Sequence, residues 1–398
     1  MAHKTDNFTL HTIEGVLYLT GISFVSYETV MPKIVESLGG SPMMIALTPV
    51  LFLFVSALPT VFIAGRSDRI KYKLPFLVPV CAIQRIAFPL VALVAWFCSD
   101  NTVIVYSILI SVVWMGLFTG IIAPFWNSMC GNTVPSRYIP RLFAIRFGIT
   151  SLLGILVGFM IKYILEWFPG RGGFGALFMI AGLMIMASLY FMSRIREPRS
   201  VSVKPRTTTL VPSYWEVVRN KDIINFTIAR IFFGATYISI AFIPVKICED
   251  LGLDNSWLGI FTVMVVIGAI AGNFFTIYWS NRFPLRHAQI ISLACYMVTF
   301  ILTIFCYNIP TALLVFFLFG FAKDCWNSVA SSMIIGLPGK RLRAKGSAFM
   351  SIAMAPPLLL CGMIGAWLYE WTGTYMVPLL ASTLLMLPGI YYSNRINR

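Results

Sequence analysis

The stretch KIVESLGG at Lys33–Gly40 returns 213 residues later as KICEDLGL at Lys246–Leu253. Matches that keep their order along the chain indicate a duplicated unit, and the offset between them changes only in segments that we expect to be loops. The chain is therefore interpreted as two homologous halves. Further pairs in the same order are Gly21 with Gly234, Ser67-Asp68-Arg69 with Ser280-Asn281-Arg282, Gly120 with Gly320, Trp126-Asn127-Ser128 with Trp326-Asn327-Ser328, and Glu166-Trp167 with Glu370-Trp371.

The composition of the 398-residue chain is typical of a polytopic membrane protein. Hydrophobic residues make up 58% and charged residues 11% of the chain, and the mean hydropathy is +0.83. A soluble protein could not cover so much apolar surface. The apolar segments are long and continuous, which predicts membrane-spanning helices and excludes a lipid-facing barrel of short alternating strands.

Twelve segments are long enough to cross a bilayer, which takes roughly 20 apolar residues. We therefore predict an all-α membrane protein with six spans in each half. The predicted domains are a first bundle at residues 1–195, a cytoplasmic linker at 196–221 and a second bundle at 222–398. The predicted spans are 13–35, 42–64, 75–98, 103–128, 141–166, 174–195, 222–246, 256–279, 286–307, 310–336, 345–369 and 376–393.

The basic excess, a formal net charge of +15, follows the predicted loops. With the N-terminus inside, 22 of the 30 lysine and arginine residues fall on predicted cytoplasmic segments and three fall on the opposite side. This asymmetry is the positive-inside rule, and it predicts a multi-pass protein of the cell membrane with both termini in the cytoplasm. Nucleic-acid binding is not expected, because no basic face lies on a folded soluble domain.

Two tandem six-helix halves joined by a basic loop resemble the major facilitator superfamily over the whole chain. The signature of that family between helices 2 and 3 reads Gly-x-x-x-Asp-Arg-x-Gly-Arg-Lys/Arg. Residues 64–73 read AGRSDRIKYK, which keeps Asp68, Arg69 and the final Lys73 but places Ala64 and Lys71 at the two glycine positions. The resemblance implies alternating access, with helices 1, 4, 7 and 10 around a central cavity that binds a small-molecule substrate. We expect a monomer in the lipid bilayer, with no cofactor other than a coupling ion, H⁺ or Na⁺.

Several charged side chains fall inside the predicted spans. An ionised group at the bilayer centre costs at least ~2.5–3.5 kcal/mol, so it normally faces protein or water and marks a functional site. Glu14 and Lys162 are expected near span ends, where they can snorkel to the interface. The interior set is Glu28, Arg85, Arg146, Arg230, Lys323 and Asp324.

Glu28 and Arg230 are predicted to face the cavity from equivalent helices. Steps of three and four residues keep a stripe of side chains on one face of a helix. With a rise of about 1.5 Å per residue, the two charges flank the bilayer midplane, where such transporters bind substrate. By the offset of 213, the stripe Leu17, Gly21, Phe24 and Glu28 corresponds to Arg230, Gly234, Tyr237 and Ala241.

The stretch AKDCWNSVAS at residues 322–331 carries a second polar group. Lys323 and Asp324 point about 100° apart on a helix, so they cannot pair well with each other, but Asn327 can share a polar face with them. One Trp-Asn pair from each half, Trp126-Asn127 and Trp326-Asn327, would offer a flat apolar surface and amide hydrogen bonds to a polar ring. The tryptophans can equally be packing residues.

The predicted substrate and coupling residues are Glu28, Arg230, Lys323, Asp324, Asn127, Asn327, Trp126, Trp326 and Tyr237. Glu28 or Asp324 is the expected protonation site, since burial disfavours an ionised carboxylate. An alternative is that Asp324 only neutralises Arg230 or Lys323 and serves folding. Arg85 is expected to be structural, because helix 3 packs outside the cavity in the family, and it can pair with Glu28.

A cytoplasmic gate is predicted from Asp68, Arg69 and Arg146. In the family, this aspartate meets the start of helix 11 in the other half, which lies here near Arg343 and Lys345. The positive end of that helix dipole would attract Asp68.

Secondary active transport of a small polar or anionic organic solute, sugar-like or an organic acid, is the function that these features favour. The alternative is a proton-coupled exporter of amphipathic drugs or lipids, although helix 5 reads GITSLLGILVGF without the Gly-Pro antiporter signature and helix 4 has no buried arginine. An enzyme is not expected, because the short outer loops carry only scattered acids. A non-transporting receptor is a third hypothesis, which the interior charges disfavour.

Overall fold

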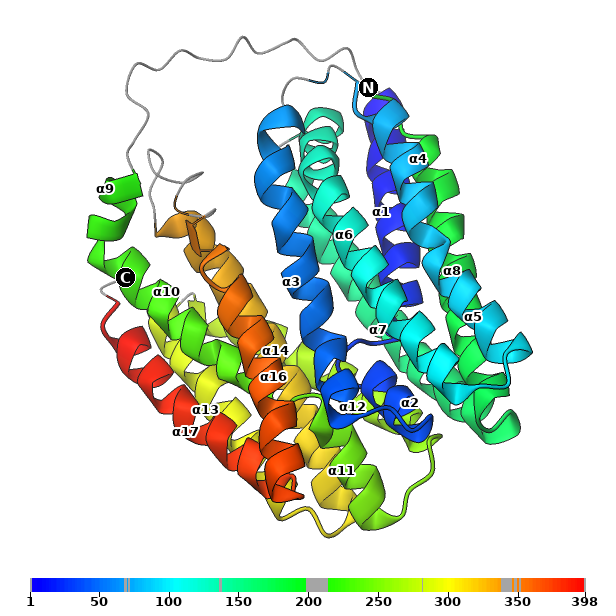
Figure 1. The fold of residues 1–398 in the computed structure, drawn as a ribbon. Helices are drawn as coiled ribbons and strands as arrows, with labels where there is room; N and C mark the ends of the chain where they lie inside the picture. Colours follow the sequence, from blue (N-terminus) through cyan, green and yellow to red (C-terminus); the bar gives the residue numbers. More distant parts are fainter. Residues whose placement is uncertain are drawn as a thin grey trace. The chain divides into compact units, whose positions relative to one another are not determined.

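The protein is helical, with no strand, over the part of the chain that the computed structural model describes. That part comprises residues 2–67, 70, 72–135, 138–197, 214–280, 282–337, 346, 349–350 and 352–396. The chain divides into two compact units, of which the first comprises Met1–Gly40 and Leu51–Thr207. The second comprises Ser41–Val50 and Thr208–Arg398. Each unit is a bundle of long helices (Figure 1), as the predicted all-α membrane fold requires.

The two bundles use the same order of helices. In the N-terminal part of the chain these are α1 (Ala2–Ser23), α2 (Val30–Ser37), α3 (Pro42–Ser67), α4 (Leu74–Arg85), α5 (Ala87–Phe97), α6 (Asn101–Thr133), α7 (Ile139–Trp167) and α8 (Arg171–Ser193). In the C-terminal part they are α9 (Tyr214–Arg219), α10 (Lys221–Phe233), the 3₁₀ helix η2 (Gly234–Ile238), α11 (Phe242–Leu251), α12 (Trp257–Ser280), α13 (Leu285–Ile304), α14 (Ile309–Gly336), α16 (Ala355–Thr372) and α17 (Met376–Asn394).

Ten stretches of the described residues are long and apolar enough to cross a membrane. They coincide with ten of the twelve predicted spans. The other two predicted spans, 13–35 and 345–369, correspond to α1–α2 and to α16. Polar residues dilute the hydropathy of α1, and Pro356, Pro357 and Glu370 dilute that of α16.

The repeat that the sequence predicts is visible in the ends of α2 and α11. Both helices are followed by a glycine in the left-handed region, Gly39 with φ of 82° and Gly252 with φ of 60°. The next amide closes the turn in each copy: Gly40 N donates to Val35 O at 2.8 Å, and Leu253 N donates to Cys248 O at 2.9 Å. Only glycine adopts this conformation without a steric cost, so the glycine of KIVESLGG and KICEDLGL has a physical reason.

Helices 4 and 10 of the predicted architecture, α6 and α14, begin with the same kind of cap. The Asp100 side chain accepts a hydrogen bond from Thr102 N at 2.8 Å, and the Asn308 side chain accepts one from Thr311 N at 2.9 Å. Such caps satisfy backbone N–H groups that have no partner within the helix. The cap therefore fixes the register of both helices that carry the Trp-Asn-Ser sequence.

Glycine also allows helices to cross backbone to backbone in both bundles. A Cβ atom on Gly120 of α6 would lie 2.3 Å from Ser56 O of α3. A Cβ atom on Gly320 of α14 would lie 2.0 Å from Val265 O of α12. These two glycines are partners in the sequence repeat, so the duplicated feature is a close helix crossing.

The helix that carries Glu28 is broken, and this corrects the predicted stripe. α1 ends at Ser23, Phe24–Thr29 forms turns, and α2 begins at Val30. Phe24 N and Val25 N donate to carbonyls three residues back, which interrupts the α-helical periodicity. The prediction that Glu28 shares a helical face with Leu17 is therefore wrong, because Glu28 lies in the turns, where it is half-buried.

Replacing Gly320 with alanine should destabilise the second bundle. The new methyl group has no room beside Val265 O, so α12 and α14 must move apart, and overpacking of this kind costs about 1–3 kcal/mol. The midpoint of thermal unfolding in detergent should fall. Gly131→Ala is the matched control, since a Cβ atom on Gly131 meets nothing within 4 Å. Equal midpoints for the two variants would contradict the close crossing.

Candidate functional site

Glu14 is the centre of a cluster of buried charges in the first bundle. Glu14 was expected near a span end, where it could snorkel, but α1 begins at Ala2 and continues to Ser23. Glu14 is therefore in mid-helix, and only 3% of its surface is exposed. A carboxylate at such depth requires partners from the same bundle.

Two arginines from different helices flank the Glu14 carboxylate. Arg85 Nη2 of α4 lies 3.5 Å from Oε1, and Arg146 Nη2 of α7 lies 3.3 Å from Oε2. Arg85 is 1% and Arg146 is 6% exposed. Arg85, for which the sequence suggested pairing with Glu28, thus forms an ion pair with Glu14. One carboxylate faces two guanidinium groups, so the cluster carries one uncompensated positive charge.

The guanidinium of Arg146 is held against the backbone of α1. A Cβ atom on Gly15 would lie 1.7 Å from Arg146 Nε, so the arginine occupies the space that glycine leaves open. The guanidinium also lies over the ring of Trp126, 4.8 Å from its centroid, and 5.8 Å from that of Phe143. Such cation–π contacts favour a charged group where water is scarce.

Three nitrogens of the arginine pair have no hydrogen-bond partner among the described residues. They are Nε and Nη1 of Arg85 and Nη1 of Arg146, and all three are buried. Buried donors are normally satisfied, because leaving them unpaired costs free energy. The cluster therefore holds more donors than Glu14 uses.

A cavity of about 250 Å³ adjoins this cluster, entirely within the first bundle. Its charged members, Glu14, Arg85 and Arg146, are buried, whereas Asn127 and Phe147 are exposed at its edge. Aromatic and polar groups share the wall, so the cavity suits a small solute with a charged or polar end. The remaining lining residues are Tyr18, Leu19, Cys81, Gln84, Thr119, Ile122, Ala123, Trp126, Phe143 and Met192.

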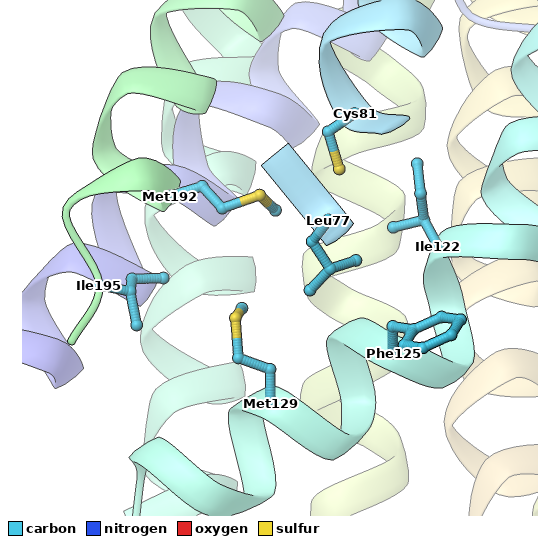
Figure 2. Close-up of a cluster of buried hydrophobic side chains, with 7 residues drawn as sticks. All are labelled: Leu77, Cys81, Ile122, Phe125, Met129, Met192 and Ile195. Carbon is cyan, nitrogen blue, oxygen red and sulfur yellow. The ribbon is translucent and has the colours of Figure 1, made fainter. Parts of the chain in front are cut away.

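An apolar cluster, drawn in Figure 2, forms part of one side of the cavity wall. Cys81, Ile122 and Met192 belong both to the cavity wall and to this cluster. In Figure 2 they come from α4, α6 and α8, and the Met192 side chain extends toward Leu77. The cluster excludes water from that side, which strengthens the electrostatic interactions of the neighbouring charges.

Polar neighbours continue from the cavity along α1 and α6. Gln84 Nε2 donates to Thr119 Oγ1 at 2.8 Å, and His11 Nε2 lies 2.8 Å from Thr133 Oγ1.

Glu14 is a site residue that the sequence analysis missed, although the sequence held a signal for it. Asn7, His11, Glu14 and Tyr18 follow one another at steps of three and four, which is a polar stripe on one face of α1.

In the second bundle, Arg230 lies in the last turn of α10. Its Nη1 donates to Met350 O at 2.9 Å, and its Nε has no hydrogen-bond partner among the described residues. Arg230 also lies over the ring of Phe226, 5.8 Å from its centroid. The structure thus gives this predicted site residue a backbone acceptor, and its role in binding stays a prediction.

Asp324 takes part in a polar network between α12 and α14. Asn273 Nδ2 donates to Asp324 Oδ1 at 3.3 Å, and Ser328 Oγ donates to Asn273 Oδ1 at 2.7 Å. Lys323 lies 6.0 Å from the ring centroid of Phe319. Asn273 escaped the sequence prediction, because nothing in its apolar surroundings indicates a partner on another helix.

The two Trp-Asn pairs are used differently. Trp126 and Asn127 line the cavity of the first bundle. Trp326 is buried and stacks on Phe233, with ring centroids 3.9 Å apart, and the Phe233 ring also meets Tyr237 edge-on. Asn327 is exposed. The packing role that the sequence left open for the tryptophans thus describes the contacts of Trp326.

The predicted gate residues Asp68 and Arg69 lie outside the described residues. Arg146, the third, contacts Glu14 and lines the cavity. Its gate role stays a prediction, and its contacts add a role in the charged cluster.

A second hollow, of about 550 Å³, lies at one end of the second bundle. It is lined by loop and helix-end residues, including Lys246, Asp250, Tyr307 and Tyr375. Lys246 and Asp250 already form an ion pair. Among the described residues, no buried unpaired donor borders this hollow, so the smaller cavity beside Glu14 is the stronger candidate site.

Comparison with known proteins relates the chain to one family. The family model described as Major Facilitator Superfamily matches residues 16–258 and 225–395. Solved structures that resemble this one include a nucleoside transporter, NupG, with a TM-score of 0.66 and 14% identity over 100% of this chain and 98% of its own. A D-xylose-proton symporter has a TM-score of 0.70 and 14% identity over 96% of each chain.

A transporter of the POT family, in complex with a thioalcohol-conjugated peptide, has a TM-score of 0.70 and 12% identity over 99% of this chain and 96% of its own. At these identities the likeness shows the fold. Comparison with curated proteins finds no match.

Replacing Gly15 with alanine should damage the site while leaving the fold intact. The methyl group would displace the end of the flexible Arg146 side chain, which costs little stability but removes a charge-assisted hydrogen bond of about 1.5–3 kcal/mol. The affinity of the purified protein for its solute should fall at least tenfold, which corresponds to about 1.4 kcal/mol of binding free energy. Gly148→Ala in α7, the helix that carries Arg146, is the control, because a Cβ atom there meets nothing within 4 Å. Unchanged affinity in Gly15→Ala would contradict this role for Arg146.

Proposed function

Because the chain belongs to the Major Facilitator Superfamily, we propose that it is an ion-coupled secondary transporter of a small polar or anionic organic solute. It carries the solute across the membrane by alternating access, and the cavity beside Glu14 forms part of the binding site. The single observation that supports this most is the buried Glu14 carboxylate between Arg85 and Arg146 at the edge of that cavity. Such a group combines a site for a proton with donors for a solute.

The solute class follows from the chemistry of the cavity. Unpaired guanidinium nitrogens suit an anionic or strongly polar acceptor. Asn127 and Thr119 add polar contacts for hydroxyl or amide groups, and Trp126 adds a flat apolar surface. Similar structures include a nucleoside transporter and a D-xylose-proton symporter, both named for polar solutes.

The second bundle is proposed to carry substrate and coupling residues of its own. Arg230 has a buried Nε without a partner among the described residues, so it can contribute a further donor. The proposal assigns a polar surface of α14 to Lys323, Asp324 and Asn327. Asp324 accepts a hydrogen bond from Asn273 there. Glu28, in the turns between α1 and α2, is proposed to act near the substrate path. Tyr237 and Trp326 would support the polar residues of the second bundle by packing on Phe233.

The export of amphipathic drugs or lipids is the competing proposal. Phe143 and Phe147 give the cavity apolar walls that such molecules would use. The paired arginines argue against lipophilic cations, because a positive cluster repels them. The distribution of lysine and arginine supports both termini in the cytoplasm. A monomer in the cell membrane is part of the proposal.

Uptake into proteoliposomes tests the proposal. The purified protein is reconstituted and supplied in turn with radiolabelled sugars, nucleosides and organic acids, with and without an imposed pH or sodium gradient. We expect gradient-driven uptake of at least one polar or anionic solute. Arg146→Gln should lower that uptake about tenfold or more, since a hydrogen bond from a charged donor contributes about 1.5–3 kcal/mol.

Lys162→Gln is the matched control for Arg146→Gln. Lys162 is also a cation of α7, but it lies beside Tyr163 and outside the cavity. Its replacement should leave uptake near the wild-type rate. If the two variants lost uptake equally, or if lipophilic cations alone were moved, the assignment of the solute site to this cavity would be wrong.

A further inference from the structure

The guanidinium groups of Arg85 and Arg146 form a binding site for a carboxylate, here called the seat, and the Glu14 carboxylate occupies it. Arg85 contacts one of its two oxygens and Arg146 contacts the other, at 3.5 and 3.3 Å. The three unpaired nitrogens, Arg85 Nε and Nη1 and Arg146 Nη1, belong to the same two guanidinium groups. Each guanidinium can therefore bind a second anionic oxygen from the adjoining cavity, because its donors form a rigid fork that matches a carboxylate.

We propose that this seat binds the carboxylate of a small organic acid, which replaces Glu14 as the partner of the two arginines when Glu14 takes up a proton. The proposal deepens the transport function and rests on it for the movement of the solute. The proton goes to the Glu14 carboxylate, and no covalent bond to the solute forms or breaks. The solute enters as an anion and stays one.

The charge of the cluster explains why the two ligands should bind together. With Glu14 ionised, two guanidinium groups and one carboxylate leave a net charge of +1. Protonation alone would raise that charge to +2 in a buried place, which is unfavourable. A proton together with a monoanion restores +1, so the loaded and empty sites carry equal charge. Electrostatics thus favours joint binding of one proton and one carboxylate.

Other titratable and charged groups near Glu14 do not offer the same exchange. His11, one turn away on α1, is engaged with Thr133, and Tyr18 lies under Arg85. Helix α8, which packs along α1, meets it at Gly21 through Ile185 and the backbone of Ala181. Among the described residues, the titratable and charged groups around the cluster are His11 and Tyr18 on α1, Cys81 and Arg85 on α4, Cys130 on α6 and Arg146 on α7.

The shape of the cavity limits the acid. A volume of about 250 Å³ is smaller than the pockets that hold drug-sized ligands, which span roughly 300–1,000 Å³. Phe143, Phe147 and Trp126 face the solute from the wall, and Asn127 is exposed at its edge. The geometry suits a small monocarboxylate with an aromatic or short hydroxylated body.

Binding to the purified protein in detergent tests the seat without transport. Isothermal titration with benzoate and with lactate is run at pH 5.5 and pH 8, with benzamide and inorganic phosphate as comparison probes. If only the form with protonated Glu14 binds the anion, each pH unit above its titration midpoint weakens apparent affinity about tenfold. We expect wild-type protein to bind at least one carboxylate more tightly at pH 5.5.

Glu14→Gln mimics the protonated residue and should bind the carboxylate with equal affinity at both pH values. Benzamide should not bind, because it lacks the charge. Loss of the pH dependence in this variant supports the seat. A wild-type-like pH dependence in Glu14→Gln, binding of benzamide as strong as that of benzoate, or stronger binding of phosphate than of either carboxylate would overturn it.

A second measurement covers the case in which Glu14→Gln does not fold. Benzoate is added to wild-type protein in weakly buffered solution at pH 8 with a pH indicator, and about one proton should be taken up per bound anion. Binding with no proton uptake overturns the proposal.

An uptake experiment in proteoliposomes then separates this inference from the transport function. Uptake of sugars or nucleosides without carboxylate binding rejects the seat alone. Proton-linked carboxylate binding without any solute uptake keeps the seat and rejects transport through it.

Discussion

A charge that is removed from water must find its partner inside the bundle, and Glu14 shows what this constraint does to the fold. Its carboxylate joins α1 to Arg85 of α4 and to Arg146 of α7. A buried ion pair adds little net stability, but losing one partner costs about 3–5 kcal/mol, because the other charge is then left alone. The cluster therefore specifies how three helices pack, down to the glycine at position 15 that makes room for Arg146.

The two bundles share the features that the backbone needs and differ where side chains do chemistry. Both copies keep the left-handed glycine after α2 or α11, the cap of α6 or α14, and a glycine at a close helix crossing. At the offset of 213, however, Thr227 stands in place of Glu14, and its hydroxyl donates to Ile223 O of its own helix at 2.7 Å. Trp326 likewise packs in the core, whereas its repeat partner Trp126 lines a cavity. Duplication thus preserved the geometry and left the polar groups free to diverge.

Hydropathy and repeats were sufficient to predict the all-helical membrane fold, the order of its long helices and the family, because those properties depend on the average composition of long segments. They could not place Glu14. The polar start of the chain gave no sign of continuing α1 back to Ala2, where the helix is tied down by contacts remote in sequence. Asn7 exchanges two hydrogen bonds with the backbone of Arg196, at 2.9 and 3.0 Å, and no local pattern predicts such a pair. The break after Ser23 was equally hidden, because no proline stands between Ser23 and Thr29 to mark it.

A purely structural role would not require both arginines. One guanidinium is enough to neutralise Glu14, and a second buried cation with unpaired N–H groups makes the cluster less stable than a simple pair. Arg85 and Arg146 nevertheless both border the cavity, with three nitrogens that no described residue satisfies. A chain under selection for folding alone would remove one of them or supply another carboxylate. The excess positive charge is best explained by a ligand that brings the missing negative charge with it.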